Sequence, residues 1–229
     1  MYLKRFGFPS YSEEKGYLFN CDTGEESVTP FSIFPQRNLA NIDFAGVTIF
    51  CGSSDSEKNL VLDLIACKLG IIECVDGLNE NLINGYLGMC YTRYAEYIEK
   101  RSDVDKIYIS REQALKHIAE NKYRFDGNNT LLHFYESRMK GKTICLIQEP
   151  ETGMSLEEIM ALTCLIEDFS VYSKTQFIIS TNSALLLGIK DALIYNFDDR
   201  IIMGRTWYNS SKAAKYVSFY RELIQKHRQ

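Results

Sequence analysis

Hydrophobic residues form short continuous runs in the last three quarters of the chain, and these runs predict buried strands at residues 47–51, 143–147, 176–180 and 192–197. Segments with a helical period separate them. Apolar positions between 60 and 69 predict a helix that Gly70 ends, and Ser155-Leu-Glu-Glu158 has the spacing of a capping box ahead of a helix to about Phe169. Apolar strands that do not alternate and that helices separate are typical of a parallel sheet covered on both faces.

The other segments have weaker patterns. Aromatic-rich runs at residues 2–8 and 16–21, divided by charged residues, glycine and proline, predict a small antiparallel sheet and loops. Residues 71–135 are richer in charge and tyrosine and predict a helical insertion, and residues 210–227 predict a terminal helix. Because no linker or internal repeat divides the chain, residues 1–229 predict a single α/β domain.

Composition and charge exclude several classes of function. The 26 Lys and Arg against 30 Asp and Glu give a net charge of -4, and the basic residues are scattered, which argues against a dedicated nucleic-acid binder. No apolar run approaches the roughly 20 residues that a membrane span needs, and the N-terminus lacks the pattern of a signal peptide. We therefore expect a cytoplasmic protein without a membrane segment.

Cysteine and histidine offer little evidence of a metal or nucleophile site. The seven cysteines contain no Cys-x-x-Cys pair, and Cys51 and Cys145 lie in apolar runs where a thiol acts as a small hydrophobe. His117, His133 and His227 have no cysteine or carboxylate at ligand spacing. We expect neither disulfides nor a zinc site.

The strongest chemical signal follows the first buried strand. Gly52-Ser-Ser-Asp-Ser-Glu-Lys58-Asn59 has the spacing of the phosphate loop Gly-x-x-x-x-Gly-Lys-Ser/Thr, but it lacks the second glycine and the final hydroxyl. Such a turn binds phosphate because backbone N–H groups and a helix N-terminus point at one anion, to which the lysine adds a positive charge. The alternative interpretation is an ordinary polar turn between a strand and a helix.

Two further strand ends carry motifs. Leu146-Ile-Gln-Glu-Pro-Glu151 resembles the strand-end Asp-Glu-Pro-Glu of the ABC-type ATPases, and Gln176-Phe-Ile-Ile-Ser-Thr-Asn-Ser183 resembles their switch strand. Together with four further segments, these two motifs resemble a family of short, stand-alone bacterial ABC-type ATPases, often labelled AAA family ATPase and distantly similar to Rad50 and SMC heads. The further segments are residues 1–4, 30–35, 47–69 and 207–220. The resemblance implies a P-loop NTPase fold with a mostly parallel sheet, an N-terminal antiparallel β region and a helical insertion.

The resemblance also implies ATP and Mg²⁺ as cofactors and a role for each matching position. The nucleotide-binding positions are Gly52, Ser53, Ser56, Glu57, Lys58 and Asn59. The magnesium positions are Asn59 and Gln148, the position of the catalytic base is Glu149, and that of the switch histidine is Asn182.

Several of these positions have lost the chemistry of the family. Asp55 and Glu57 replace glycines, Asn59 and Gln148 replace the magnesium-binding hydroxyl and aspartate, and the signature serine, glycine and glutamate correspond to Asp126, Asn128 and Asn129. Carboxylates a few ångströms from a bound phosphate cost on the order of several kcal/mol, against the roughly 8 kcal/mol that micromolar binding requires. We expect weak or absent ATP binding, no nucleotide in the purified protein, and a Lys58 that pairs with Asp55, Glu57 or Glu149.

The sequence thus favours a pseudo-ATPase that serves as a binding or regulatory module, with a protein partner such as a second copy or a homologous ATPase. One alternative is a divergent but working ATPase, in which Asn59 and Gln148 hold Mg²⁺ weakly and a homologous partner completes the site. Another, by analogy only, is an accessory subunit of a nuclease or defence system. For Glu149 and Glu151, a role as solvated loop charges is the simpler alternative.

Overall fold

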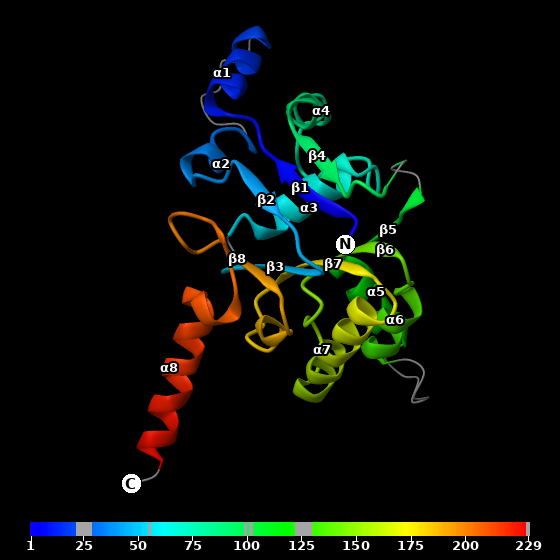
Figure 1. Cartoon of the computed structure of the whole chain (residues 1–229), viewed down its shortest axis with the longest axis vertical. Coiled ribbons are helices and arrows are strands. Elements are labelled where there is room, and N and C mark those ends of the chain that lie inside the picture. The colour runs from blue at the N-terminus through cyan, green and yellow to red at the C-terminus, as the bar shows by residue number, and fades with distance from the viewer. Residues whose placement is uncertain (22–28, 55, 99, 101–102, 122–129, 228–229) are drawn as a thin grey trace.

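The computed structural model describes residues 1–21, 29–54, 56–98, 100, 103–121 and 130–227, which form an α/β structure with two sheets (Figure 1). The larger sheet has six strands in the order β5-β6-β7-β3-β8-β9. Its first five strands are parallel, and only β9 runs antiparallel to its neighbour. The strands are β3 (Val47–Cys51), β5 (Asp105–Ile109), β6 (Thr143–Gln148), β7 (Gln176–Thr181), β8 (Leu193–Asn196) and β9 (Gly204–Arg205).

The central strands are those that the continuous apolar runs predict. β6, β7 and β3 are neighbours in parallel register, with Ile147 and Ile49 both opposite Ile179, so their carboxyl ends meet at one edge of the sheet. Helix α3 (Lys58–Lys68) follows β3, and α7 (Leu156–Val171) follows β6 with the predicted capping box between Ser155 and Glu158. The parallel-sheet prediction is confirmed.

Alternate side chains of the central strands enter two separate cores. Phe50, Leu146 and Ile178 pack on one face of the sheet with the buried side of α3. Ile49 and Ile179, on the other face, pack with buried residues of α7 and of α6 (Leu131–Arg138). Both faces are therefore covered, which explains why these strands lack a polar alternation.

The smaller sheet is antiparallel, in the order β2-β1-β4, with β1 at Leu3–Gly7, β2 at Asn41–Asp43 and β4 at Tyr91–Tyr94. A buried glutamine ties it to the larger sheet. Gln176, the first residue of β7, accepts hydrogen bonds from the backbone N–H groups of Tyr2 and Leu3 at 2.8 Å each and donates to the carbonyls of Leu3 (2.8 Å) and Ala45 (3.1 Å). The expected antiparallel β region near the N-terminus is present.

Two predictions about secondary structure are wrong. Residues 16–20 belong to helix α1 (Tyr11–Asn20), with Cys21 as its C-terminal cap, rather than to a strand or loop, because Ser10 and Glu13 form a capping box that starts the helix. The segment 71–135 contains helices α4 (Glu80–Met89) and α5 (Arg111–Asn121) together with α6, but it also supplies β4 and β5. These two strands lie at sheet edges, where charged and half-buried residues hide the strand pattern.

The predicted terminal helix is α8 (Ser211–Lys226), which projects from the body of the molecule in Figure 1. The short helix α2 (Ile33–Gln36) lies in the N-terminal region. Among the helices of the described residues, none has both the length and the hydropathy that a membrane span requires.

Candidate functional site

The predicted phosphate-loop-like turn joins β3 to α3 at the carboxyl edge of the larger sheet, with Glu57 as the N-terminal cap residue of the helix. Gly52 begins the turn, and a Cβ there would lie 2.4 Å from the Ser56 hydroxyl oxygen, so the close approach requires glycine. The Ser56 hydroxyl donates to the Ser53 carbonyl at 2.8 Å. Asp55 lies outside the described residues.

Lys58 is fully buried at the start of α3 and points at a carboxylate. Its Nζ lies 3.0 Å from Oε1 of Glu149 and 3.0 Å from the Ser53 carbonyl oxygen. Glu149 follows β6 with a left-handed φ of 42°, a conformation that an L residue adopts at a cost, and its N–H donates to the Ser180 carbonyl at 2.9 Å. The expected pairing of Lys58 with a carboxylate is present, with Glu149.

Four donors converge on the buried Glu149 carboxylate. Besides Lys58, the Asn59 and Asn182 side-chain amides donate to Oε1 at 3.0 and 3.3 Å, and the Arg111 guanidinium lies 3.2 Å from Oε2. Burial raises the pKa of this carboxyl, but the hydrogen bonds from Lys58 and Asn59 and the charges of Lys58 and Arg111 outweigh it, so the pKa is lower than usual. Glu149 is therefore an ionised, internally neutralised carboxylate rather than a solvated loop charge.

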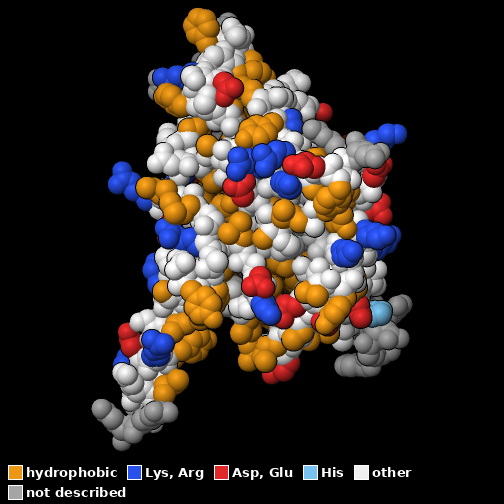
Figure 2. All heavy atoms as spheres, viewed as in Figure 1, with side chains coloured by type: hydrophobic (Ala, Val, Ile, Leu, Met, Phe, Trp, Pro, Cys, Tyr) orange, Lys and Arg blue, Asp and Glu red, His pale blue; other side chains and the backbone are white. Residues whose placement is uncertain are grey.

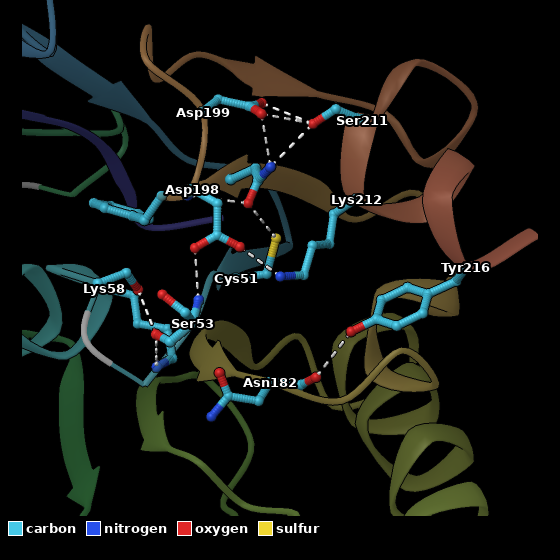
Figure 3. A network of polar contacts seen from close by, with 12 residues as sticks. Cys51, Ser53, Lys58, Asn182, Asp198, Asp199, Ser211, Lys212 and Tyr216 are labelled. Atoms are coloured by element: carbon cyan, nitrogen blue, oxygen red, sulfur yellow. Dashed lines mark hydrogen bonds and ion pairs between the residues drawn. The ribbon is translucent and has the colours of Figure 1, made fainter. Parts of the chain in front are cut away.

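A second carboxylate lies against the turn itself. Oδ1 of Asp198 accepts a hydrogen bond from the Ser53 backbone N–H at 2.7 Å, and its Oδ2 lies 2.5 Å from Nζ of Lys212 on α8 (Figure 3). Burial opposes the charge, but the hydrogen bonds from Lys212 and Ser53 lower the pKa of Asp198. The backbone N–H of Ser53, near the start of the turn, is thus bonded to a carboxylate of the same chain.

Asp198 belongs to a network that links β8 to the start of α8. The Asn196 side-chain amide donates to Oδ1 of Asp199 at 2.9 Å and to the Ser211 hydroxyl at 3.0 Å, and that hydroxyl donates to Asp199 (Figure 3). Farther along α8, the Tyr216 hydroxyl donates to the Asn182 carbonyl at 3.3 Å. The first turns of α8 therefore contact both the turn side and the switch-strand side of the site.

The remaining positions of the sequence motifs have other partners. The carboxylate of Glu57 lies 3.8 Å from the guanidinium of Arg37, so it is turned away from Lys58. The Gln148 side-chain oxygen accepts from the Arg111 backbone N–H at 3.3 Å. Residues 126–129 of the proposed signature segment lie outside the described residues, and Thr130, which follows them, caps α6.

The two predicted magnesium positions, Asn59 and Gln148, do not suit Mg²⁺. Mg²⁺ prefers carboxylate oxygens and water in octahedral geometry, whereas Asn59 and Gln148 offer neutral amide oxygens. Both carboxylate oxygens of Glu149 are occupied by donors. No group of three or more His, Cys, Asp and Glu side chains within the described part of the chain could hold a metal ion.

The structure places Cys51, Cys145 and His117 in packed surroundings. All seven cysteines are free, and burial raises the pKa of the Cys51 and Cys145 thiols to about 12. The His117 ring lies against Phe134 with 4.8 Å between the ring centroids, and it contacts Asn121 in the same helix.

Sequence reasoning missed Arg111 and Asp198. Arg111 starts α5 directly after β5, an edge strand that the sequence pattern does not predict. Asp198 and Asp199, by contrast, follow a correctly predicted strand, so a search for charged residues after each strand end would have found them.

Comparison with known proteins gives only a distant likeness. No family model and no curated protein matches the chain. The SMC head domain from Thermotoga maritima is 13% identical, with a TM-score of 0.42, and the match covers 90% of this chain and 99% of that one. An SMC head bound to the C-winged helix domain of ScpA is 12% identical, with a TM-score of 0.46 and coverage of 93% and 98%. Identities this low carry no information about the site residues, whose chemistry follows from the contacts above.

Proposed function

We propose that the chain is a degenerate ABC-type ATPase-like protein, a pseudo-ATPase that serves as a binding or regulatory module with weak or absent ATP binding and hydrolysis. The observation that carries the proposal is the buried ion pair between Lys58 and Glu149, 3.0 Å apart. In the family that the motifs resemble, the corresponding lysine binds phosphate. Here its charge is neutralised within the chain.

A phosphate group entering the turn would meet two carboxylates. It would displace Glu149 from Lys58 and Asp198 from the Ser53 N–H, or it would lie beside them. A like-charge contact at 4 Å costs about 4 kcal/mol at the effective dielectric constant near a protein surface, which is half of the roughly 8 kcal/mol that a micromolar complex requires. Two such contacts are sufficient to abolish micromolar binding.

Hydrolysis would lack further groups besides the phosphate site. Asn182 stands at the switch position with its amide directed at Glu149, and Gln148 stands at the magnesium position with its oxygen on the Arg111 N–H. Without a bound metal and a switch histidine, the site lacks the groups that stabilise the charge developing in the transition state. A carboxylate base alone would therefore support little hydrolysis. A role through contact with a protein partner is therefore favoured over catalysis.

The test is repair of the phosphate site. The variant Glu149→Gln, Asp198→Asn, Asn59→Ser, Gln148→Asp removes the two carboxylates that bind Lys58 and the Ser53 N–H and restores a hydroxyl and a carboxylate for Mg²⁺. Equilibrium dialysis with labelled ATP and Mg²⁺ should show tighter binding by the variant than by the wild type, while phosphate release stays slow in both. Adding Lys58→Met to the repaired variant is the control and should abolish the gain.

Two results would overturn the proposal. Wild-type binding as tight as that of the repaired variant would show that the turn is not closed by its own carboxylates. Steady phosphate release by the wild type, lost in Lys58→Met, would identify a divergent working ATPase instead.

A further inference from the structure

A cavity of about 390 Å³ lies at the edge of the larger sheet opposite to the phosphate-loop-like turn. Three of the residues that line it, Gly46, Lys142 and Lys174, come just before β3, β6 and β7 respectively. Because these strands are parallel, their first residues meet at the amino edge of the sheet, whereas Lys58 and Glu149 lie at the carboxyl edge. The cavity is therefore separate from the candidate site described above.

The smaller sheet supplies an aromatic side of the cavity. Tyr2 lies before β1 and Tyr97 after β4, their ring centroids are 6.4 Å apart, and Tyr97 is 65% exposed. Gln176 fixes this side to the start of β7 through its hydrogen bonds with the backbone of Tyr2 and Leu3. On the face shown in Figure 2, hydrophobic side chains with Lys and Arg side chains close by lie around the position that N marks in Figure 1.

The two lysines that line the cavity have no counter-charge. Lys142 and Lys174 have left-handed φ values of 58° and 56°, and the Lys142 N–H donates to the Ser173 carbonyl at 3.0 Å, which holds their two turns side by side. Neither lysine forms an ion pair with another described residue, and no described Asp or Glu lines the cavity. A chain with a net charge of -4 thus keeps two unpaired cations at one cavity.

The next cavity along this edge has the opposite charge. It shares Gly46 and Ser170 with the first cavity, and its other lining residues include three acidic side chains and one basic one, Glu167, Asp168, Asp191 and Lys190. An anion at this edge is therefore attracted to the side with Lys142 and Lys174 and repelled from the other side.

We propose that the cavity beside Lys142 and Lys174 binds a small phosphate monoester with an aromatic or other apolar body. A phosphate monoester carries about 1.5 to 2 negative charges near neutral pH, which matches two lysine ammonium groups. The Ser170 hydroxyl, which has no hydrogen-bond partner among the described residues, is a further donor at the cavity. The phosphate group alone leaves most of the volume unfilled, so the body of the ligand lies against Tyr2 and Tyr97. The inference is independent of the proposed function, because it uses no residue of the phosphate-loop-like turn.

The test is calorimetric titration of the full-length chain with three probes. Phenyl phosphate should bind, inorganic phosphate should bind more weakly because it leaves the aromatic side unfilled, and the neutral benzyl alcohol should give no binding signal. Added salt should weaken phenyl phosphate binding, since the attraction is between charges at the surface.

Variants of the lysines locate the site. Lys142→Asn and Lys174→Asn each remove one charge and introduce a residue that tolerates the left-handed backbone. Each should weaken phenyl phosphate binding about tenfold, the effect of losing one charge-assisted hydrogen bond. Lys140→Asn is the matched control, because Lys140 is exposed and close in sequence but does not line the cavity, and it should leave binding nearly unchanged.

A variant of the aromatic side provides a second readout. Tyr97→Ala should weaken the binding of phenyl phosphate but not that of inorganic phosphate. The proposal would be overturned by a wild type that does not bind phenyl phosphate at millimolar concentrations, by binding that survives Lys142→Asn and Lys174→Asn together, or by an equal loss in Lys140→Asn. Binding of benzyl alcohol as tight as that of phenyl phosphate would also overturn it, since the cavity would then select no anion.

Discussion

The buried ion pair between Lys58 and Glu149 makes a quantitative prediction about stability. The side chains are 0% and 6% exposed. Glu149→Gln keeps an acceptor for the surrounding donors but removes the only carboxylate that the structure places against the Lys58 ammonium among the described residues. Breaking a buried pair from one side costs about 3–5 kcal/mol, a large part of the 5–15 kcal/mol that a typical domain has.

The companion change, Lys58→Met, should cost less. The Glu149 carboxylate keeps Arg111, whose side chain is 47% exposed, as a cation at 3.2 Å. We therefore expect about 1–3 kcal/mol. The double variant buries neither charge of the pair, so its destabilisation should fall short of the sum of the two single changes by about 2–3 kcal/mol.

Urea unfolding at neutral pH measures all four corners of this double-mutant cycle. The exposed pair Lys116–Glu120, with N and O 3.9 Å apart, is the matched control. The cycle Lys116→Met, Glu120→Gln should give a coupling energy of about 0.5 kcal/mol or less. A coupling energy for Lys58 and Glu149 no larger than that of the control would refute the buried ion pair and, with it, the proposal that Glu149 neutralises Lys58.

Three further predictions concern carboxylates whose pKa is shifted. Burial raises the pKa of Asp63 to about 6, so between about pH 4 and 6 the folded protein keeps a proton that the unfolded chain releases. The free energy of unfolding should therefore fall as pH rises through this range. In urea titrations, Asp63→Asn should abolish the fall and gain up to about 3 kcal/mol at neutral pH. The pKa of Glu149 is lowered, so its contribution to stability is fully present above the ordinary pKa of 4.5 and is lost as pH falls through the pKa of the folded state. Acid unfolding should therefore be steeper in the wild type than in Glu149→Gln. Asp198→Asn breaks the ion pair with Lys212, so amide hydrogen exchange in the first turns of α8 should accelerate; unchanged exchange would contradict the tether.

The central part of the fold was predictable because its signals are local. Continuous apolar runs identify β3, β6 and β7, since a strand buried on both faces has no polar side. A capping box fixes the start of α7, because the Ser155 side chain and Glu158 satisfy backbone N–H groups within one turn. The edge strands carry no such signal: β5 begins with Asp105 and Lys106 and becomes a strand only through its pairing with β6.

The candidate site was predictable in its positions but not in its contacts. The rule that parallel strands present their carboxyl ends at one edge brings Lys58, Glu149 and Asn182 together from three segments. Whether Lys58 would pair with Glu57 or Glu149 depended on the side-chain directions at the start of α3, which no spacing encodes. Glu57 instead lies beside Arg37, a residue of the N-terminal region that only the tertiary fold brings near.

The turn between β3 and α3 satisfies its buried charge and a backbone donor within the chain. Lys58 is fully buried, so without an anion its charge would cost several kcal/mol, and the Ser53 N–H would lack a partner. Glu149 and Asp198 supply those anions from the ends of β6 and β8, and Asp198 is in turn fixed by Lys212 of α8. Any anion that entered the turn would therefore compete with a carboxylate that also holds the terminal helix. By linkage, a change that stabilises the docked position of α8 would weaken anion binding. The free energy of this coupling equals that by which a bound anion would destabilise the docked α8.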